Sequence, residues 1–492
     1  NCRRSYPLQS GLGMSPALVV VGVFVLFIAV LIIRALLFRP GDADIVTMSS
    51  HEFDRDTVSG HLSRMIRIPT VSSRDPGQVD SARFDEFRAL LGDLYPTITA
   101  QCERTLIGET GVVYRWKGRS PDDATVLMAH YDVVAADSAE WDKPPFSGEI
   151  DEDGVLWGRG AIDTKITLCA ILEAVEMRMR NGFVPEHDVY LSFSGDEETM
   201  GPSAPAIVAW MEEKGIRPAL VLDEGGAVVT GVFPGVKKPC AVVGITEKGV
   251  LDIEFSARAA GGHSSAPALR QPVVDLAKAI EKISRKPFPL RLTPAAAKMF
   301  NTLGRHSSFA FRLLFANLWC FLPLFKLVCK LSGGELAALM RTTCCFTVLE
   351  GAPQYNVMPP VARSGANLRL LPGDTAVTAR DRLEKIVRKT GVTLRTVYAY
   401  DPSPVADLDG YAWKRVHDAV ASTWPDAIVS PYLMVACTDS RHFCRVSPTV
   451  LKFSAMALTK EERASMHAKN ERIPVDKIVT ACQFFWRILE TA

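Results

Sequence analysis

The chain has 492 residues, of which 48% are hydrophobic and 23% are charged, and its formal net charge is +1. A single hydrophobic core rarely organises a chain of this length, so we expect two or more folded units. A net charge close to zero provides no global basic field, and nucleic acid is therefore not an expected partner.

The first predicted element is an apolar helix over 15–38, which follows an N-terminal tail over 1–14. Residues 17–33 contain no charged or polar side chain, and the apolar run resumes after Arg34. A helix of this length crosses a hydrocarbon core of about 30 Å, with Arg34 at the interface. We interpret it as a transmembrane signal anchor, followed by a tether over 39–54. The alternative is a cleaved signal peptide, whose apolar region is typically about 7–15 residues long.

Short apolar runs and helical stretches alternate over 55–246, which is typical of an α/β sheet. Buried strands are predicted at 125–130, 189–193 and 219–223. Helices are predicted between them at 164–180 and 203–214, each closed by a glycine. Each strand ends in a charged cluster, and ligands of open α/β sheets bind outside the carboxyl ends of the strands. We therefore expect the three strand ends to converge on one crevice.

The α/β pattern is interrupted by an inserted α+β unit over 247–400 and resumes over 401–492. Residues 250–255 alternate like a half-exposed strand. Helical stretches are predicted at 272–284 and 376–390. The insertion therefore divides the larger domain into two parts.

A very apolar and aromatic segment at 309–331 lies within the insertion. Arg312, Pro323, Lys326 and Lys330 interrupt it, which argues against a second membrane span. One hypothesis is a buried helical hairpin of the inserted unit. The other is an apolar wall near the site or the membrane that receives a lipid-like substrate.

The 11 cysteines are scattered, and none shows the paired short spacing of a zinc finger or a redox motif. We interpret most of them as small buried hydrophobic side chains, with one or two disulfides if the domain is luminal. They do not discriminate between functions.

Charged clusters at the first two strand ends supply candidate chemistry. Residues i and i+2 of a strand point the same way, so Asp132 is placed to hold the second ring nitrogen of a metal-bound His130. Asp163 follows a glycine turn, and Glu197 and Glu198 follow the second strand. Taken singly, these are also readable as a surface ion pair, a helix N-cap and a solvated acidic loop.

Two further groups complete the set. Asp223 and Glu224 follow the third strand, and His467 lies in a polar loop before the last helix, which begins near Pro474. The clusters together bring histidines and carboxylates to strand ends and a loop of the expected fold. Such nitrogen and oxygen ligands suit zinc, and a shared aspartate is the usual bridge in paired-metal hydrolases.

These clusters resemble, in order, spacing and neighbours, the zinc-dependent aminoacylase and carboxypeptidase-S family of peptidases. The resemblance runs from about residue 55 to the C-terminus and includes the carboxypeptidase S and N-fatty-acyl-amino-acid synthase/hydrolase branches. The blocks that carry it are MAHYDVV, WGRGAIDTK, SGDEETMG, LDEGG, GGHSSAP, NVMPP, NLRLLPG, CTDSRHF and MHAKNERI. The resemblance implies a di-zinc α/β catalytic domain with a doubly wound sheet over 55–246 and 401–492. It also implies that 247–400 is a lid or dimerisation domain and that the chain forms a homodimer.

Carried over residue by residue, the resemblance implies two zinc ions bridged by Asp163. One zinc would be held by His130, Asp163 and Asp223. The other would be held by Asp163, Glu198 and His467. The peptide bond after Asp163 is often cis in such proteins.

The resemblance also implies roles in catalysis and substrate binding. Glu197 would be the general base, and Asp132 would orient His130. His263 would stabilise the oxyanion, often from the other subunit of a dimer. Arg369 and Asn356 would hold the substrate carboxylate and the reacting carbonyl. The position two before Arg369 is often Asp in the family and is Asn367 here.

The implied function is hydrolysis of an amide bond next to a free carboxylate, in a peptide or an N-acyl amino acid, by metal-activated water. One alternative is an N-fatty-acyl amino acid synthase/hydrolase as the main role. A remote alternative is an inactive binding protein on the same fold. We expect the catalytic domain in a secretory or vacuolar lumen or outside the cell, either anchored in the membrane or secreted after signal cleavage.

Overall fold

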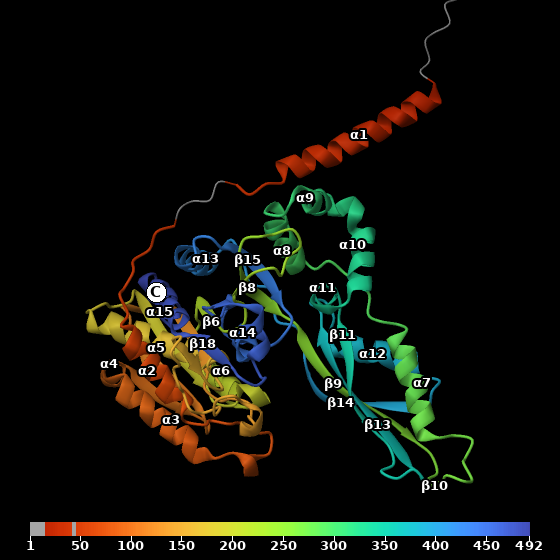
Figure 1. The fold of residues 1–492 in the computed structure, drawn as a ribbon, viewed down its shortest axis with the longest axis horizontal. Helices are drawn as coiled ribbons and strands as arrows, with labels where there is room; N and C mark the ends of the chain where they lie inside the picture. Colours follow the sequence, from red (N-terminus) through yellow and green to blue (C-terminus); the bar gives the residue numbers. More distant parts are fainter. Residues whose placement is uncertain (1–14, 42–45) are drawn as a thin grey trace, which may run out of the picture.

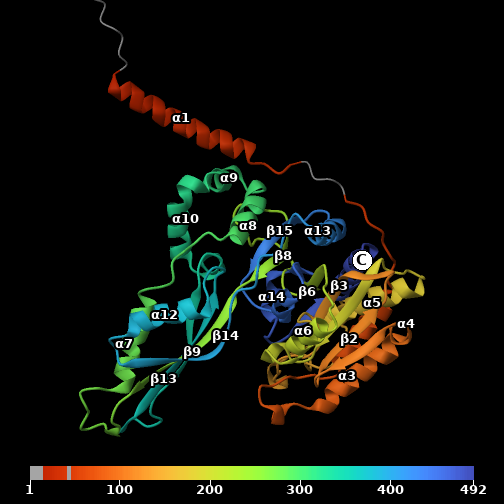
Figure 2. The same ribbon diagram turned by 180° about the vertical axis from the view of Figure 1, so that it is seen from behind.

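The computed structural model describes residues 15–41 and 46–492. The predicted tail over 1–14 and residues 42–45 of the predicted tether lie outside the described residues. A large α/β part and a smaller sheet lie side by side, and a long N-terminal helix lies above them (Figure 1). The view from behind shows the same arrangement, with the smaller sheet beside the α/β part (Figure 2).

A ten-stranded sheet forms the centre of the α/β part. Its order is β1-β2-β5-β3-β6-β16-β8-β7-β17, and β15 pairs with β8. The strands are β1 (Glu103–Ile107), β2 (Gly111–Trp116), β3 (Ser120–His130), β5 (His187–Ser194), β6 (Leu220–Asp223), β7 (Val228–Val229), β8 (Cys240–Glu247), β15 (Ile428–Met434), β16 (Val450–Lys452) and β17 (Ala457–Leu458). Because β3 runs parallel to both β5 and β6, the carboxyl ends of these three strands meet at one edge. The three predicted strands and their convergence are confirmed.

Helices cover both faces of this sheet, as a doubly wound fold requires. Alternate residues of a strand point to opposite faces. On β3, Leu127 and Ala129 belong to one hydrophobic core, whereas Val126 and Met128 belong to another. The first core is covered by α2 (Arg55–Ile66), α3 (Ser81–Leu94), α4 (Pro96–Gln101), α5 (Lys165–Arg180), α13 (Tyr411–Thr423) and α15 (Val475–Glu490). The second core is covered by α6 (Ser203–Glu213).

The inserted unit is built on a four-stranded antiparallel sheet. Its order is β11-β13-β9-β14. The strands are β9 (Gly249–Arg258), β11 (Thr343–Glu350), β13 (Val361–Leu370) and β14 (Val392–Tyr400). Leu276 of α7 (Pro272–Ser284) and Leu383 of α12 (Ala376–Val387) pack on it in a core separate from the cores of the large sheet. At the far tip, β10 (Gly262–His263) pairs with β12 (Val357–Met358).

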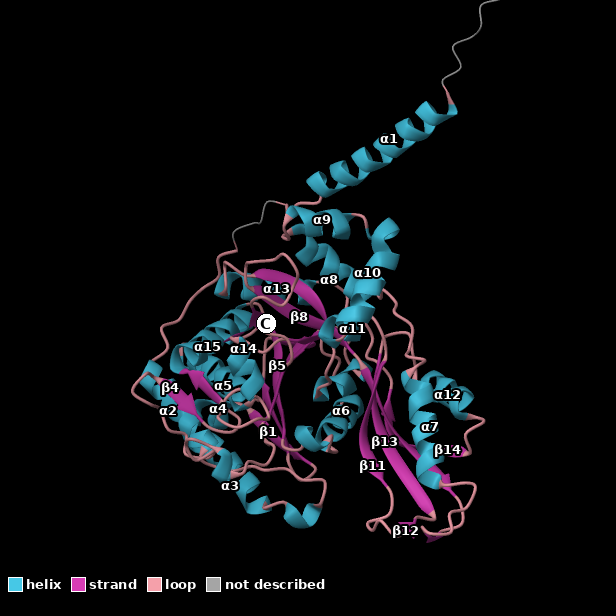
Figure 3. Cartoon of the chain, turned by 45° about the vertical axis from the view of Figure 1, so that its right-hand side comes forward, coloured by secondary structure: helices cyan, strands magenta, loops and turns pink. Residues whose placement is uncertain are grey.

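The helices between these strands pack on the large α/β part instead. They are α8 (Pro294–Arg305), α9 (Phe309–Ala316), α10 (Leu318–Ser332) and α11 (Gly334–Ala338). The rings of Phe300, Phe315 and Phe325 contact one another inside the core of the large sheet. Figure 3 shows α8 to α10 above that sheet and away from α7 and α12.

The hypothesis of a buried hairpin within the inserted unit was wrong in two respects. Its helices α9 and α10 are bent by 111° and pack on the other domain. Their outer face is also exposed, with Trp319 and Leu331 at 61% and 77% of full accessibility. Sequence periodicity could not settle this, because the segment is apolar on nearly every face and carries no sign of which face is buried.

The N-terminal helix α1 (Pro16–Leu37) is long and apolar enough to cross a membrane and is almost entirely exposed along its length. Its C-terminal end is attached to the bend between α9 and α10. Arg34 Nη2 donates to the carbonyl of Ala316 over 2.9 Å, and Arg34 Nε donates to Asn317 Oδ1 over 3.1 Å. Asn317 Nδ2 in turn donates to the carbonyl of Leu31 over 3.0 Å. The helix is therefore held by specific polar contacts as well as by apolar packing.

The ten cysteines within the described ranges are all free, so none of them forms a disulfide with another. Only Cys169, Cys240, Cys329 and Cys482 of these ten are buried, so the prediction that most of the cysteines are buried was wrong for the described residues.

Candidate active site

Adjacent strand ends bring the predicted site residues together. His130 is the last residue of β3, and Glu224 directly follows β6. Glu197 and Glu198 form the short turn η3 (Glu197–Thr199), which comes soon after β5. Since β5, β3 and β6 are neighbours in the sheet, these side chains share one edge.

Asp163 is placed by a turn between β4 (Val155–Trp157) and α5. A Cβ at Gly160, where φ is +88°, would come within 2.9 Å of the Val133 side chain, so only glycine fits this position. The peptide bond between Asp163 and Thr164 is cis.

A buried carboxylate anchors this turn from the last part of the chain. Glu471 accepts from the backbone N–H groups of Gly160, Ile162 and Asp163 over 2.7–3.1 Å. Arg159 Nη1 donates to the same carboxylate over 2.8 Å. Both side chains of this ion pair are almost completely buried. Glu471 was not predicted as a site residue, although it lies in the MHAKNERI block, because a carboxylate that caps backbone groups has no distinctive spacing.

The Asp163 carboxylate joins the two histidines. Its Oδ1 lies 3.1 Å from His130 Nε2, and its Oδ2 lies 2.9 Å from His467 Nε2. Glu198 Oε2 lies 3.1 Å from the same His467 nitrogen. Glu224 Oε1 lies 3.2 Å from His130 Nε2. Each carboxylate oxygen of Asp163 therefore contacts a different histidine.

Asp132 lies behind this cluster and fixes two of its parts. His130 Nδ1 lies 3.0 Å from the Asp132 carbonyl and 3.3 Å from its Oδ1. The backbone N–H groups of Glu197 and Glu198 each donate to the Asp132 carboxylate over 3.1 Å. Ser72 Oγ donates to it over 2.7 Å. This fully buried carboxylate thus orients a histidine ring and the glutamate turn together.

The cluster carries an excess of negative charge. Burial and the neighbouring Asp439 raise the pKa of Glu197 well above its ordinary value, although His130 opposes this. Burial and neighbouring carboxylates also raise the pKa of Glu224 to about 7. Hydrogen bonds with Asp163 and Glu198 raise the pKa of His467 to about 10. Within residues 15–41 and 46–492, no lysine or arginine forms an ion pair with Asp163, Glu197, Glu198 or Glu224. Bound protons are therefore favoured at this site, because they offset its negative charge.

The donor set fits metal ions. His130, Asp163 and Glu198 have ligand atoms within 4.8 Å of one another, and so do His130, Glu197 and Glu224. Imidazole nitrogens and carboxylate oxygens are the ligands that zinc accepts in hydrolytic sites. A cation would also relieve the repulsion among these carboxylates.

Asp223, predicted as a ligand, is buried and contacts a backbone group. Its Oδ2 accepts from the backbone N–H of Ser440 over 3.1 Å. The next residue, Glu224, contacts His130 instead. Successive residues leaving a strand point to opposite sides, so only one of the two can face the site. The geometry therefore favours Glu224.

The three predicted residues of the inserted unit lie in two places. Arg369 Nη1 donates to Cys437 Sγ over 3.1 Å, beside the cluster, and its Nε donates to Asn367 Oδ1 over 3.2 Å. His263 and Asn356 instead lie together at the exposed tip of the small sheet, where the Ser264 N–H donates to the Asn356 carbonyl over 3.1 Å. The structure does not bring these two residues to the cluster of their own chain (Figure 1).

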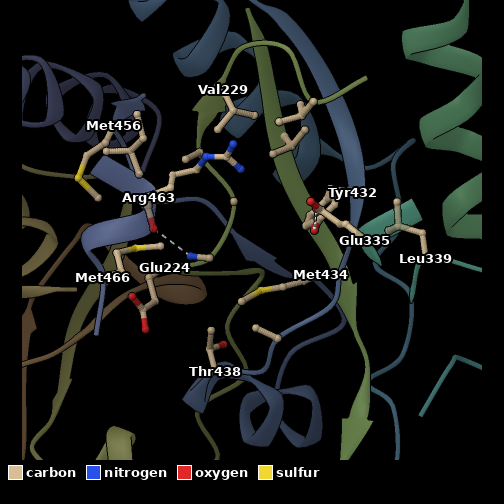
Figure 4. A pocket seen from close by; sticks show the side chains of 18 of the residues that line it. Glu224, Val229, Glu335, Leu339, Tyr432, Met434, Thr438, Met456, Arg463 and Met466 are labelled. Carbon is tan, nitrogen blue, oxygen red and sulfur yellow. Dashed lines mark hydrogen bonds between the residues drawn. The ribbon is translucent and has the colours of Figure 1, made fainter. Parts of the chain in front are cut away.

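A cavity of about 390 Å³ opens onto the cluster. Figure 4 shows Glu224 and Thr438 at one side of it and Val229, Met456 and Leu339 at others. Its lining includes Asp163, Glu197, Glu198 and His467. Much of the remaining lining is apolar: Val229, Val232, Phe233, Val242, Met299, Phe300, Leu303, Leu336, Leu339, Met434, Met456 and Leu458. A pocket of this size and character accepts a small organic molecule with an apolar portion.

Comparison with known proteins places the chain among metallopeptidases. Residues 126–491 match the model of peptidase family M20/M25/M40. The chain is 32% identical over 437 residues to the probable carboxypeptidase S-like 2 of Dictyostelium discoideum, covering 87% of this chain and 84% of that protein. It is 32% identical over 451 residues to the N-fatty-acyl-amino acid synthase/hydrolase PM20D1 of Xenopus tropicalis, covering 90% and 87%. The M20 family metallo-carboxypeptidase Sso-CP2 from Sulfolobus solfataricus shares the fold, with a TM-score of 0.66 at 18% identity over 88% of this chain and 98% of that one.

Replacing Glu471 with Ala should destabilise the fold, because Arg159 would stay buried without its counter-ion and three backbone N–H groups would lose their acceptor. Breaking a buried pair in this way lowers the free energy of unfolding by about 3–5 kcal/mol. Circular dichroism should show a clear drop in the midpoint of thermal unfolding. The control Glu384→Ala removes an exposed pair with Arg380 and should cost less than about 0.5 kcal/mol. Equal midpoints for the two variants would contradict the anchoring role of Glu471.

Proposed function

Since the chain belongs to peptidase family M20/M25/M40, we propose that it holds two zinc ions and cleaves an amide bond adjacent to a free carboxylate. The observation that carries this proposal is the double contact of Asp163, whose two oxygens face His130 and His467. A carboxylate in that position is the natural bridge between two metal ions. The chain is thus a metallopeptidase-type amidohydrolase.

We assign one zinc to His130, Asp163 and Glu224, and the other to Asp163, Glu198 and His467. Glu224 takes the place for which the sequence had favoured Asp223. When bound, the ions supply Lewis-acid chemistry: they lower the pKa of coordinated water to about 7 and polarise the substrate carbonyl.

Glu197 is the proposed general base. It lines the cavity, and its backbone N–H is fixed by Asp132. Burial and neighbouring acids raise its pKa, which suits a group that first takes a proton from the attacking water and then gives it to the leaving amine. An inactive binding protein is disfavoured, because histidines, bridging carboxylate and base are all present at one site.

Arg369 is the proposed partner of the substrate carboxylate. A guanidinium binds a carboxylate through two parallel hydrogen bonds, which selects substrates with a free acid group. The contact between Arg369 and Cys437 supports this role, because Cys437 lines the cavity. Asn367 and Asp252 hold the other side of the guanidinium in a hydrogen-bonded chain.

The proposed substrates are peptides and N-acyl amino acids, and the cavity favours the second. Its lining beyond the acidic cluster is mainly apolar, with side chains from α8, α11, β7, β8, β15, β17 and the loops beside them. An N-fatty-acyl amino acid presents a carboxylate for Arg369 and a long apolar chain for this lining. We therefore propose a role as an N-fatty-acyl amino acid synthase/hydrolase in addition to a carboxypeptidase role.

We propose that His263 and Asn356 act on the site of a second copy in a homodimer, with the sheet of the inserted unit as the lid or dimerisation element. The support is their position: they are adjacent, exposed and far from the cluster of their own chain. An imidazole and an amide are suitable donors for a developing oxyanion.

We also propose that α1 stays attached as a membrane anchor, with the catalytic domain in a secretory or vacuolar lumen or outside the cell. The support is the set of contacts between α1 and the domain: Asn317 is fully buried against α1, donates to the Leu31 carbonyl and accepts from the Arg34 guanidinium. Such buried polar groups are costly when unpaired.

Replacing Glu197 with Gln should lower kcat by about 10²–10⁴-fold, because the amide keeps the shape and loses the proton acceptor. The assay compares release of the free amino acid from a blocked dipeptide and from an oleoyl amino acid, and the bound zinc should be unchanged. The control Glu213→Gln changes an exposed residue of α6 and should retain full activity. Unchanged turnover in Glu197→Gln would remove the proposed mechanism.

Replacing Glu224 with Gln should lower the zinc content by about one ion per chain, because an amide is a weaker ligand than a carboxylate. Asp223→Asn keeps an acceptor for the Ser440 N–H and should retain both ions. Elemental analysis after dialysis measures the difference. The opposite result, with zinc lost only from Asp223→Asn, would restore the original assignment of Asp223.

Replacing Val232 with Trp should discriminate between the two substrate classes. Val232 lines the cavity but is 36% exposed, so a larger side chain fills the cavity without disturbing the core. The kcat/KM for an oleoyl amino acid should fall about tenfold or more, which corresponds to about 1.4 kcal/mol, while that for a small blocked dipeptide should hold. Val184→Trp is the matched control at an exposed valine outside the cavity lining. A strong preference of the unaltered enzyme for the dipeptide would refute the fatty-acyl role.

A further inference from the structure

The outer face of the bend formed by α9 and α10 is apolar and largely exposed within the described chain. We propose that this bend, defined as residues 309–332 and called the elbow here, inserts into the lipid bilayer beside α1 as a second membrane contact. Its exposed side chains are Phe309, Phe311, Trp319, Leu324, Leu327, Val328 and Leu331. A patch of this kind on a globular domain marks an interaction site.

The helix α10 differs from an ordinary surface helix because it is apolar on both faces. Phe325 and Cys329 point into the core and are buried. Leu324, Leu327 and Leu331 occur at helical spacing on the opposite face and are 50–77% exposed. A helix that packs on a soluble domain normally turns charged or polar residues outward. The composition of α10 therefore calls for an apolar environment on its outer side.

The position of the elbow on α1 identifies that environment as lipid. Trp319 packs edge-on against Phe27 of α1, with ring centroids 6.1 Å apart. The polar contacts of Arg34 with Ala316 and Asn317 lie at the end of the same helix. A bilayer that surrounds α1 must therefore also meet the elbow.

Helix geometry gives the depth of insertion. Phe27 lies seven residues before Arg34, which is about 10 Å along the helix axis. If the Arg34 guanidinium marks the interface, Trp319 lies about 10 Å inside it. Amphipathic elements that lie in the membrane interface bury their apolar faces by about 5–10 Å. The elbow is thus at the depth of an interfacial element and not of a spanning one.

The charge distribution of the surrounding segment provides independent support. The helices α8, α9 and α10 contain five Lys and Arg residues and no Asp or Glu, although the whole chain has a net charge of only +1. Lys326 and Lys330 belong to the elbow itself. Basic side chains beside an inserted apolar surface extend their charged ends to the polar headgroups while their apolar stems contact lipid.

Membrane insertion here would bring lipid close to the catalytic cavity. Phe315 of α9 and Phe325 of α10 contact Phe300, at ring-centroid distances of 5.8 and 5.2 Å. Phe300 also lines the cavity. One layer of aromatic side chains therefore separates the elbow from the apolar end of the cavity. This inference rests on the proposed function, and it places the cavity beside the lipid in which fatty-acyl substrates dissolve.

The test uses the full chain in phosphatidylcholine–phosphatidylserine vesicles whose acyl chains carry bromine, which quenches tryptophan only at close range. Of the eight tryptophans, Trp319 alone lies in the elbow, and α1 contains none. Bromine should quench part of the emission, and that part should fall by about half or more in Trp319→Phe if insertion reaches the interfacial depth. Trp210→Phe, on α6, is the matched control and should keep the quenching. Identical quenching in wild type and Trp319→Phe would overturn the proposal.

A second variant distinguishes lipid from a protein partner on the same face. Leu324→Glu with Leu327→Glu places charges on the exposed side of α10 and should reduce bromine quenching of Trp319. Val377→Glu, at a 68% exposed position of α12, should leave it unchanged. If the double variant instead separates a dimer in detergent while wild-type Trp319 is never quenched, the elbow is a protein interface and the proposal fails. The measurement needs no substrate, so its outcome is independent of the proposed amide hydrolysis.

Discussion

Asp163, Glu198 and Glu224 crowd around two histidines in a mostly buried space, where like charges repel strongly. Three parallel strand ends create this crowding, and the surrounding structure is organised to hold it. The backbone donors that meet Asp132 and Glu471 keep the glutamate turn and the Asp163 turn in place without adding mobile cations. The remaining excess of negative charge is what makes the site selective for metal ions.

The sequence predicted the α/β part well, because each strand there is a short apolar run that ends in charge. It also led to the cluster itself, since His130, Asp163, Glu198 and His467 lie together in space. The sequence does not distinguish Asp223 from Glu224 as a ligand, because adjacent acids look equivalent until the direction of each side chain is known. Glu471 was not predicted, because its partners are backbone N–H groups and such contacts leave no pattern in the amino-acid sequence.

The inserted unit was harder to predict from sequence, and the reason is physical. Its sheet and the helices α7 and α12 show clear periodicity, so their existence and boundaries could be read. The elbow is apolar on all sides, and hydrophobicity alone does not tell a protein core from lipid. Only the contacts with α1 and the exposure of Trp319 separate the two environments. The location of a segment along the chain likewise does not fix the domain on which it packs.

The position of His467 has a consequence for biosynthesis. The cluster joins His130 to His467, which follows it by 337 positions, so a growing chain carries the acidic residues of the cluster long before it acquires the last histidine. The completed donor set exists only once His467 has left the ribosome. If α1 directs the chain across a membrane, metal loading then follows translocation and depends on the metal ions of the receiving compartment.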